Sequence, residues 1–257
     1  MSVDRLEPGL RIVLVQTQHP GNIGSAARAM KTMGLHELVL VDPLGLPTHR
    51  DALAMAAGAD DVLAGARIVA DVASAVADCA FVVGCTARSR HVTLPGMAPR
   101  EAVAQMQVQA VHGPVALLFG CERTGLTNVE LQACHATAHI PANPAYGSLN
   151  LAAAVQVLCY EWRLAALASD GADGEPEAAT QRSDPPATQA QMDGLFTHLE
   201  HTLDAIDFHK GRSPATVMRR LRALFLRAQP DARELRILRG ILADAQRMAK
   251  LAGRKVE

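Results

Sequence analysis

The stretch RIVLVQTQHPGNIGSAARAMKTMG, residues 11–34, holds the unit on which the fold prediction depends. It opens with a short aliphatic run, residues 11–15, which is typical of a buried strand. The turn HPGN follows, and we expect Asn22 to cap a helix over roughly Ile23 to Met33 that Gly34 ends. Apolar side chains recur on one face of this helix, whereas Arg28 lies on its polar face. The stretch therefore predicts a strand, a loop and a helix in succession.

The same alternation continues through the first two thirds of the chain. Further buried strands are predicted at ELVLVDP (37–43), ARIVADV (66–72), CAFVVGCTA (79–87) and PVALLFG (114–120), with helical or turn segments between them. Strands that alternate with helices indicate an α/β domain with a mostly parallel sheet. In such a sheet, ligands bind in the loops beyond the carboxyl ends of the strands.

Charge is distributed unevenly along the 257 residues. Residues 1–168 carry 11 Lys and Arg against 13 Asp and Glu, whereas residues 182–257 carry 14 against 9. The segment 169–190 is rich in Ala, Asp, Glu, Gly and Pro without apolar periodicity, which is typical of a flexible linker. We therefore expect three parts: an α/β domain over 1–168, a linker over 169–190 and a basic helical module over 191–257. A basic module favours an anionic partner.

Several classes of protein are disfavoured by composition. The N-terminus lacks the apolar stretch of a signal peptide, and no uninterrupted apolar run reaches the roughly 18 residues that a membrane span needs. The five cysteines form no CxxC pair, and the ten histidines form no HExxH motif, so we expect free thiols and no metal. Aromatic residues make up only 3%, which argues against a surface that stacks bases on Phe, Tyr or Trp. The chain is expected to be soluble and cytoplasmic.

Three loops stand out as candidate binding segments. The first is HPGN with the helix that follows it, and the second is GCERTGLT (120–127), which has the glycine spacing of a phosphate-binding loop. Leu126 stands where that loop needs a lysine, and no GxGxxG follows the first strand, so neither ATP nor NAD binding is supported. The third, HIPANPAYGSLN (139–150), leads into a helix that is apolar nearly all round. Such a helix is buried in a core or in a subunit interface.

Taken together and in this order, the three loops resemble those of the SPOUT class of trefoil-knotted RNA methyltransferases, in its 2′-O-ribose branch. Asn22 and Arg28 match that branch's PGNxGxxxR motif, and the second motif is matched by Gly120, Glu122, Gly125 and Leu126. The Ser-Leu-Asn of the third motif is Ser148, Leu149 and Asn150. The resemblance covers about residues 10–168 and is weaker in the C-terminal module.

The resemblance implies a knotted parallel sheet, a homodimer and S-adenosylmethionine as the methyl donor. It implies tRNA as the substrate, with the ribose of a pyrimidine, nucleotide 32 of the anticodon loop, as the methyl acceptor. There are two alternatives. The protein is a 2′-O-methyltransferase that acts on another tRNA or rRNA nucleotide, or it is a non-catalytic RNA-binding protein with the same fold. Carried over by position, the cofactor-binding residues are Cys85, Thr86, Ala87, Gly120, Ile140, Gly147, Ser148 and Leu149.

The resemblance also implies roles for the catalytic candidates Arg28, Ser148 and Asn22. A guanidinium is too basic to lose a proton readily, so we expect Arg28 to clamp phosphate and stabilise the developing alkoxide. Ser148 is expected to orient the ribose hydroxyl, although a serine here could instead cap the last helix. Asn22 is expected to fix the Arg28 loop, and Glu122 to hold backbone amides of the second loop.

The basic module is expected to bind the RNA backbone. Breaks at Gly211, Pro214 and Pro230 divide it into helices whose apolar residues can form a small core, namely Leu221, Leu224, Phe225, Leu235, Leu238, Ile241 and Leu242. Eight arginines within 28 residues can remain outside this core. The candidate RNA-binding residues are Arg212, Arg219, Arg220 and Arg222.

Overall fold

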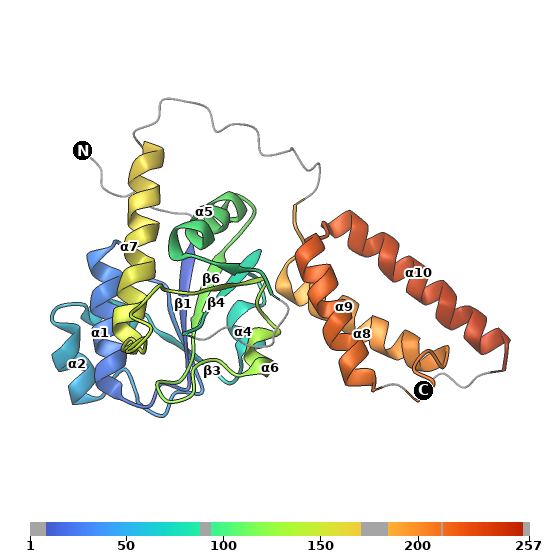
Figure 1. Cartoon of the computed structure of the whole chain (residues 1–257), viewed down its shortest axis with the longest axis horizontal. Helices are drawn as coiled ribbons and strands as arrows, with labels where there is room; N and C mark the ends of the chain where they lie inside the picture. Colours follow the sequence, from blue (N-terminus) through green and yellow to red (C-terminus); the bar gives the residue numbers. More distant parts are fainter. Residues whose placement is uncertain (1–8, 88–93, 171–184, 212, 254–257) are drawn as a thin grey trace. The chain divides into compact units, whose positions relative to one another are not determined.

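The computed structural model of the chain describes residues 9–87, 94–170, 185–211 and 213–253 (Figure 1). The chain forms two compact units, Met1–Ala179 and Thr180–Glu257. Within the segment predicted to be a linker, residues 169–170 belong to one helix and residues 189–190 to the next. Residues 171–184 of that segment lie outside the described residues.

The first unit is built on a parallel sheet. In the described ranges its order is β3-β2-β1-β6-β4-β7-β5, and every neighbouring pair is parallel. β6 enters between β1 and β4, and β7 enters between β4 and β5, so later strands are inserted between earlier ones. Such insertion is compatible with a threaded chain, and the knot itself stays a prediction. The strands are β1 (Leu10–Val15), β2 (Leu38–Val41), β3 (Arg67–Val69), β4 (Phe81–Cys85), β5 (Gly96–Met97), β6 (Val115–Phe119) and β7 (Ala136–Ala138).

Helices cover both faces of this sheet. Because side chains alternate along a strand, Ile12 and Leu14 of β1 pack in one core with α1, α5 and α7, whereas Val13 and Val15 pack in the other with α4 and α6. This layered arrangement is visible around the central strands in Figure 1. The helices of the unit are α1 (Pro20–Thr32), α2 (Arg50–Ala56), α3 (Asp60–Ala64), α4 (Val72–Val76), α5 (Pro99–Ala110), α6 (Asn128–Leu131) and α7 (Leu151–Asp170).

The α/β class and the strands at 11–15, 37–43, 79–87 and 114–120 are confirmed. The strand predicted at 66–72 exists, but it is not fully buried. β3 pairs only with β2 at the sheet edge, which leaves Ile68 52% exposed. The prediction missed β5 and β7, because two or three residues are too few to show a period.

The start of α1 also differs from the prediction. His19 is the N-cap residue and Pro20 occupies the first turn, where its fixed φ and missing N–H cost nothing. Asn22 is therefore inside the first turn rather than at the cap, and its side chain is free to act elsewhere. The predicted end is confirmed, since Met33 is the C-cap and Gly34 follows with φ +79°.

A buried arginine lies on the second face of β1. Arg11 is 4% exposed and donates to both oxygens of Asp78, at 2.6 and 2.9 Å, and to the carbonyl of Ala75 at 2.8 Å. Its Nε donates to Glu37. A buried guanidinium is tolerated only when its donors are satisfied, and these acceptors anchor α4 and β2 to β1.

α7 packs its apolar side chains inside the first unit. Val155, Leu158 and Trp162 are at most 2% exposed and belong to the core shared with α1 and α5. Of the two settings expected for such a helix, a core or a subunit interface, these residues lie in the core of a single chain. Residues Leu151–Ala168 are also long and apolar enough to cross a membrane, with a mean hydropathy of 1.3. Glu161 and Arg163 interrupt this stretch, so the sequence shows no continuous apolar run of that length. The inner face of the helix is buried, as in a core helix.

The second unit is helical, as expected. It contains α8 (Gln189–Ala205), α9 (Pro214–Ala228) and α10 (Ala232–Leu251). Its core centres on α8, with Leu195 and Phe196 1% exposed, and includes Leu226 and Leu235. Two predicted core residues are instead exposed, Leu224 at 49% and Ile241 at 61%, because α8 already covers the opposite faces of α9 and α10.

We predict that Gly24→Ala destabilises the first unit by at least about 2 kcal/mol. A Cβ at Gly24 would lie 2.0 Å from the carbonyl oxygen of Ala52, so α1 and α2 would have to separate. Urea unfolding followed by the fluorescence of Trp162, the one tryptophan of the chain, measures this unit. Gly21→Ala on the same helix is the control, since its nearest neighbour would be the Met55 Cγ at 3.5 Å. Equal midpoints for both variants would contradict the packing argument.

Candidate active site

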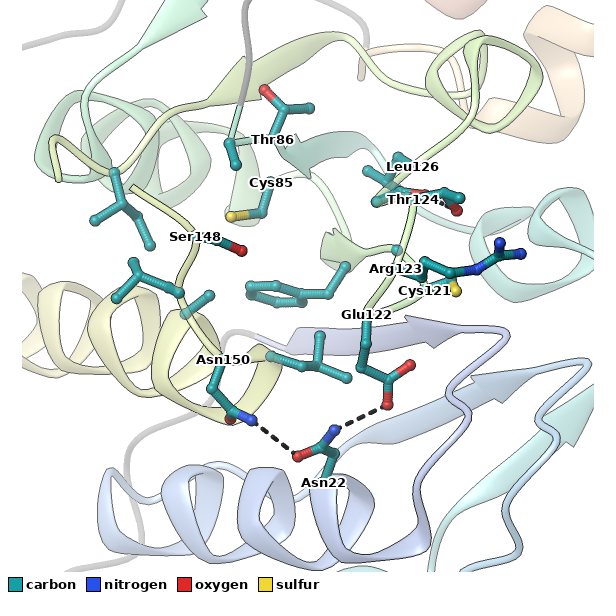
Figure 2. Close-up of a pocket in the computed structure, with 18 of the residues that line it drawn as sticks. Asn22, Cys85, Thr86, Cys121, Glu122, Arg123, Thr124, Leu126, Ser148 and Asn150 are labelled. Atoms are coloured by element: carbon teal, nitrogen blue, oxygen red, sulfur yellow. Dashed lines mark hydrogen bonds between the residues drawn. The ribbon is translucent and has the colours of Figure 1, made fainter. Parts of the chain in front are cut away.

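Loops that follow the carboxyl ends of the central strands enclose one pocket (Figure 2). Its volume is about 800 Å³, which lies in the range of small-molecule sites. The chain reaches it after β1, β4, β6 and β7, as expected for a parallel sheet. The structure brings all eight predicted cofactor-binding residues together in its lining: Cys85, Thr86, Ala87, Gly120, Ile140, Gly147, Ser148 and Leu149.

A chain of hydrogen bonds joins the three motif loops at the floor of this pocket. The Asn150 Nδ2 donates to the Asn22 Oδ1 at 3.1 Å, and the Asn22 Nδ2 donates to the Glu122 Oε1 at 2.9 Å. Figure 2 shows the three side chains in line, from the start of α7 through α1 to the loop after β6. Asn22 therefore acts as the link between the second and the third motif.

Glu122 accepts more than this one bond. Its carboxylate accepts the backbone N–H of Gln18, at 3.0 and 3.2 Å, and that of His19, at 3.2 Å. Burial opposes ionisation of the carboxyl, but the hydrogen bonds from Asn22, Gln18 and His19 outweigh it, so the pKa of Glu122 lies below its ordinary value. Glu122 was expected to hold amides of its own loop. Its own N–H is among the donors, but the amides of Gln18 and His19 belong to the first loop. A carboxylate so occupied is a structural acceptor.

The second loop folds tightly on itself. The Gly125 N–H donates to the carbonyl of Cys121 at 2.8 Å, and Gly125 has φ +64°. A Cβ at Gly120 would lie 2.1 Å from the amide nitrogen of Leu126. Glycine at 120 is therefore required by the loop itself. Leu126, which stands where a phosphate-binding loop has its lysine, is 1% exposed and packs in the core.

Ser148 points toward the middle of the pocket in Figure 2. The alternative role considered for it, the cap of the last helix, belongs to Asn150. The Asn150 Oδ1 accepts the N–H of Ala152 at 2.9 Å, at the start of α7. The Ser148 hydroxyl is therefore available to a ligand. Cys85 also lines the pocket, and burial raises the pKa of its thiol to about 12, so that it stays protonated and does not act as a nucleophile.

Arg28 is the predicted catalytic residue that the structure does not bring to the pocket. It is exposed on α1 and lies outside the residues that line the cavity. Six residues along a helix place the side chain about 120° around the helix axis from that of Asn22. The prediction that Arg28 lies on the polar face of α1 is confirmed. At this position the side chain can contact a ligand that binds outside the cofactor pocket.

Other lining residues were not predicted. Arg123 and Thr124 belong to the second motif loop, and Leu151 and Ala154 to the first turns of α7. Each lies within a few residues of a motif position, which is the signal that could have identified them. Among the residues that the structure describes, no three His, Cys, Asp or Glu side chains gather as a metal site.

The predicted RNA-binding arginines lie in different settings. Arg219 and Arg220 are exposed on α9, whereas Arg212 lies outside the described residues. Arg222 is engaged within the second unit: it donates to Asp193 at 2.8 Å and its guanidinium lies 4.3 Å from the ring centre of Phe196. It therefore holds α9 against α8, a role that the sequence pattern did not indicate.

This sheet order, with three motif loops at one pocket, defines a class of methyltransferase. The profile of the SpoU rRNA methylase family matches residues 9–160. A second profile, for the C-terminal domain of the tRNA methyltransferase TrmJ, matches residues 190–254. The chain belongs to the SpoU rRNA methylase family.

Its relatives are similar over nearly the whole length. The chain is 50% identical to the tRNA (cytidine/uridine-2′-O-)-methyltransferase TrmJ of Citrobacter koseri, over 94% of this chain and 98% of that protein. It is 49% identical to TrmJ of Escherichia coli K12, over 96% and 98%. The crystal structure of TrmJ from Z. mobilis ZM4 superposes with a TM-score of 0.78 at 38% identity, covering 91% of this chain and 97% of that one.

We predict that Glu122→Gln raises amide hydrogen exchange at Gln18 and His19 by about tenfold or more. A neutral amide accepts more weakly than a carboxylate, and bonds to charged groups contribute about 1.5–3 kcal/mol. Exchange measured by NMR or mass spectrometry reports the loop directly. Glu161→Gln is the matched control, because Glu161 pairs with Arg100 on the surface instead. Unchanged exchange at both amides in Glu122→Gln would remove Glu122 as the anchor of the first loop.

Proposed function

We propose that this protein transfers a methyl group from S-adenosylmethionine to the ribose 2′-hydroxyl of a cytidine or uridine in tRNA, at nucleotide 32 of the anticodon loop. The observation that carries the proposal is the pocket, where all eight residues expected to bind the cofactor lie together. Similarity to TrmJ over both units supports the same reaction. We also propose that the protein acts in the cytoplasm.

The pocket fits S-adenosylmethionine in size and in chemistry. Ile140 and Leu149 offer apolar surface for an adenine, and Ser148 offers a hydroxyl within a cavity of about 800 Å³. When bound, the cofactor supplies an electrophilic methyl group on a sulfonium. The pocket lacks the lysine of a phosphate-binding loop, because Leu126 is buried at that position.

The residues of this chain then have to align the ribose hydroxyl and help its proton to leave. Ser148 orients the hydroxyl from inside the pocket. Asn22 keeps the second and third loops at fixed separation through Glu122 and Asn150. Arg28, outside the pocket, holds a phosphate of the RNA next to the target ribose, a task for which the planar guanidinium is suited.

The two units divide the work between them. The acidic first unit performs the chemistry, and the second unit, with 14 Lys and Arg against 9 Asp and Glu in residues 182–257, supplies most of the tRNA affinity.

We propose a homodimer as well. On the outer face of α7, Ala153, Tyr160 and Leu167 are exposed at intervals of seven residues, which forms an apolar stripe suited to a second copy.

The direct test is methyl transfer to tRNA with the product mapped by mass spectrometry. We expect calorimetry to show micromolar binding of S-adenosylmethionine or its demethylated product, about 8 kcal/mol at 1 μM. We expect a 2′-O-methyl group at nucleotide 32, and none when that nucleotide is 2′-deoxy. The proposal would be contradicted if the protein bound NAD or ATP but neither S-adenosylmethionine nor its demethylated product. A product methylated on a base instead of the ribose would also contradict it.

Arg28→Ala should lose most of the activity while its stability and its cofactor affinity stay at the wild-type values. The side chain is exposed and outside the pocket, so neither the core nor the cofactor site depends on it. Arg28→Lys should also be impaired, because a point charge does not replace a bidentate fork. Single-turnover methylation with saturating cofactor measures the effect. A wild-type rate in Arg28→Ala would exclude this residue from the mechanism.

Truncation after Asp170, where α7 ends, should leave a dimer that binds cofactor but binds tRNA weakly. The full chain should lose affinity with salt at a log–log slope of roughly −0.7 to −0.9 per phosphate contacted, and the truncated chain should show a shallower slope. Binding assays over a salt series and analytical ultracentrifugation provide both readouts. Unchanged tRNA affinity would contradict the division of work, and a monomer at micromolar concentration would contradict the α7 interface.

A further inference from the structure

Tyr146 is the most exposed of the large hydrophobic side chains in the described residues, at 84%. It lies in the loop between β7 and α7, two residues before Ser148. Gly147, Ser148 and Leu149 line the pocket, whereas Tyr146 does not. Tyr146 therefore directly precedes, on the same loop, the three residues that line the pocket.

The turn that carries Tyr146 is closed by its own hydrogen bonds. The Tyr146 N–H donates to the carbonyl of Asn143 at 2.9 Å, and the Ala145 N–H donates to the Asn143 Oδ1 at 3.0 Å. Further along, Asn150 ties the end of the loop to Asn22. The turn is closed and the end of the loop is tied to α1, so the backbone that carries the ring loses little freedom when a ligand packs on it.

Among the aromatic residues that the structure describes, Tyr146 alone combines exposure with a place at the pocket. Phe119 lines the pocket but is 2% exposed, and Trp162 is buried in α7. Tyr160 lies on the outer face of α7, and Phe208 belongs to the second unit. Aromatic residues make up only 3% of the sequence, so a single platform is favoured over an extended stacking surface.

The reaction supplies a reason for such a platform. A nucleotide whose ribose enters a pocket loses stacking contacts with its neighbours, as a base does when it is taken out of the stack for modification. An unstacked RNA base regains contact by packing on an aromatic ring. We propose that Tyr146 stacks on the nucleobase of the target nucleotide and so holds its ribose at Ser148. This inference rests on the proposed function and adds the base-binding residue to it.

The test is a double-mutant cycle between the ring and the base. Wild type, Tyr146→Phe, Tyr146→Leu and Tyr146→Ala methylate a tRNA with an intact target nucleotide and one in which that nucleotide is abasic but keeps its 2′-hydroxyl. On intact tRNA, we expect Tyr146→Ala and Tyr146→Leu to lower kcat/KM about five- to hundredfold, and Tyr146→Phe to retain activity. On abasic tRNA, wild type should be as slow as Tyr146→Ala, and removal of the ring should cost nothing more.

Controls separate stacking from damage to the fold or to the site. Affinity for S-adenosylhomocysteine should be the same in all four proteins. Val111→Ala removes another exposed apolar side chain, which is 76% exposed. Val111 precedes β6, at the amino end of the sheet, so kcat/KM on both tRNAs should stay at the wild-type value. Wild-type activity of Tyr146→Ala on intact tRNA, or an equal loss on abasic tRNA, would overturn the stacking role. A wild-type protein that methylates neither substrate would instead contradict the proposed function.

Discussion

The hydrogen-bond chain from Asn150 through Asn22 to Glu122 is the interaction on which the pocket depends. It joins residues 128 and 100 positions apart in sequence, and the same carboxylate holds the amides of Gln18 and His19. A partly buried carboxylate is stable only with such donors, and an unpaired one would be costly. Because each motif contributes one member, the loss of Asn22 would break the link between the second and third motifs. The pocket is thus held together by hydrogen bonds within the chain.

The parallel sheet brings these loops within reach of one another. β6 lies between β1 and β4, so the loops after all three strands end at one edge, and β7 leads into α7 from the same edge. Small residues permit this density: Gly24 lies against the backbone of Ala52, and Gly120 against that of Leu126. The scaffold is therefore rigid where the cofactor fits, and the residues assigned to RNA lie outside it, Arg28 on α1 and Tyr146 on the loop before α7.

The sequence predicted the parts of this structure that depend on local patterns. Aliphatic runs located four buried strands, and motif resemblance located eight residues that line the pocket. Prediction failed where an outcome depends on residues far apart in the chain. Nothing near Asn22 indicates that Glu122 is its partner, and nothing near Arg222 indicates Asp193. β5 and β7 escaped because hydrogen bonds to neighbouring strands, not periodicity, define them. The pattern of α7 left a core and a subunit interface open, because a helix pattern does not state which partner covers it.

The measurement that tests this account most directly is a crystal structure of the protein with S-adenosylhomocysteine. We predict the adenine between Ile140 and Leu149, the former methyl position facing the Ser148 hydroxyl, and the bonds among Asn150, Asn22 and Glu122 unchanged. Because hydrogen bonds within the chain hold the motif loops together, the lining backbone should lie within about 1 Å of the positions described here. Density for the ligand elsewhere on the chain, or a rearranged Glu122 with its bonds to Gln18 and His19 broken, would contradict the account.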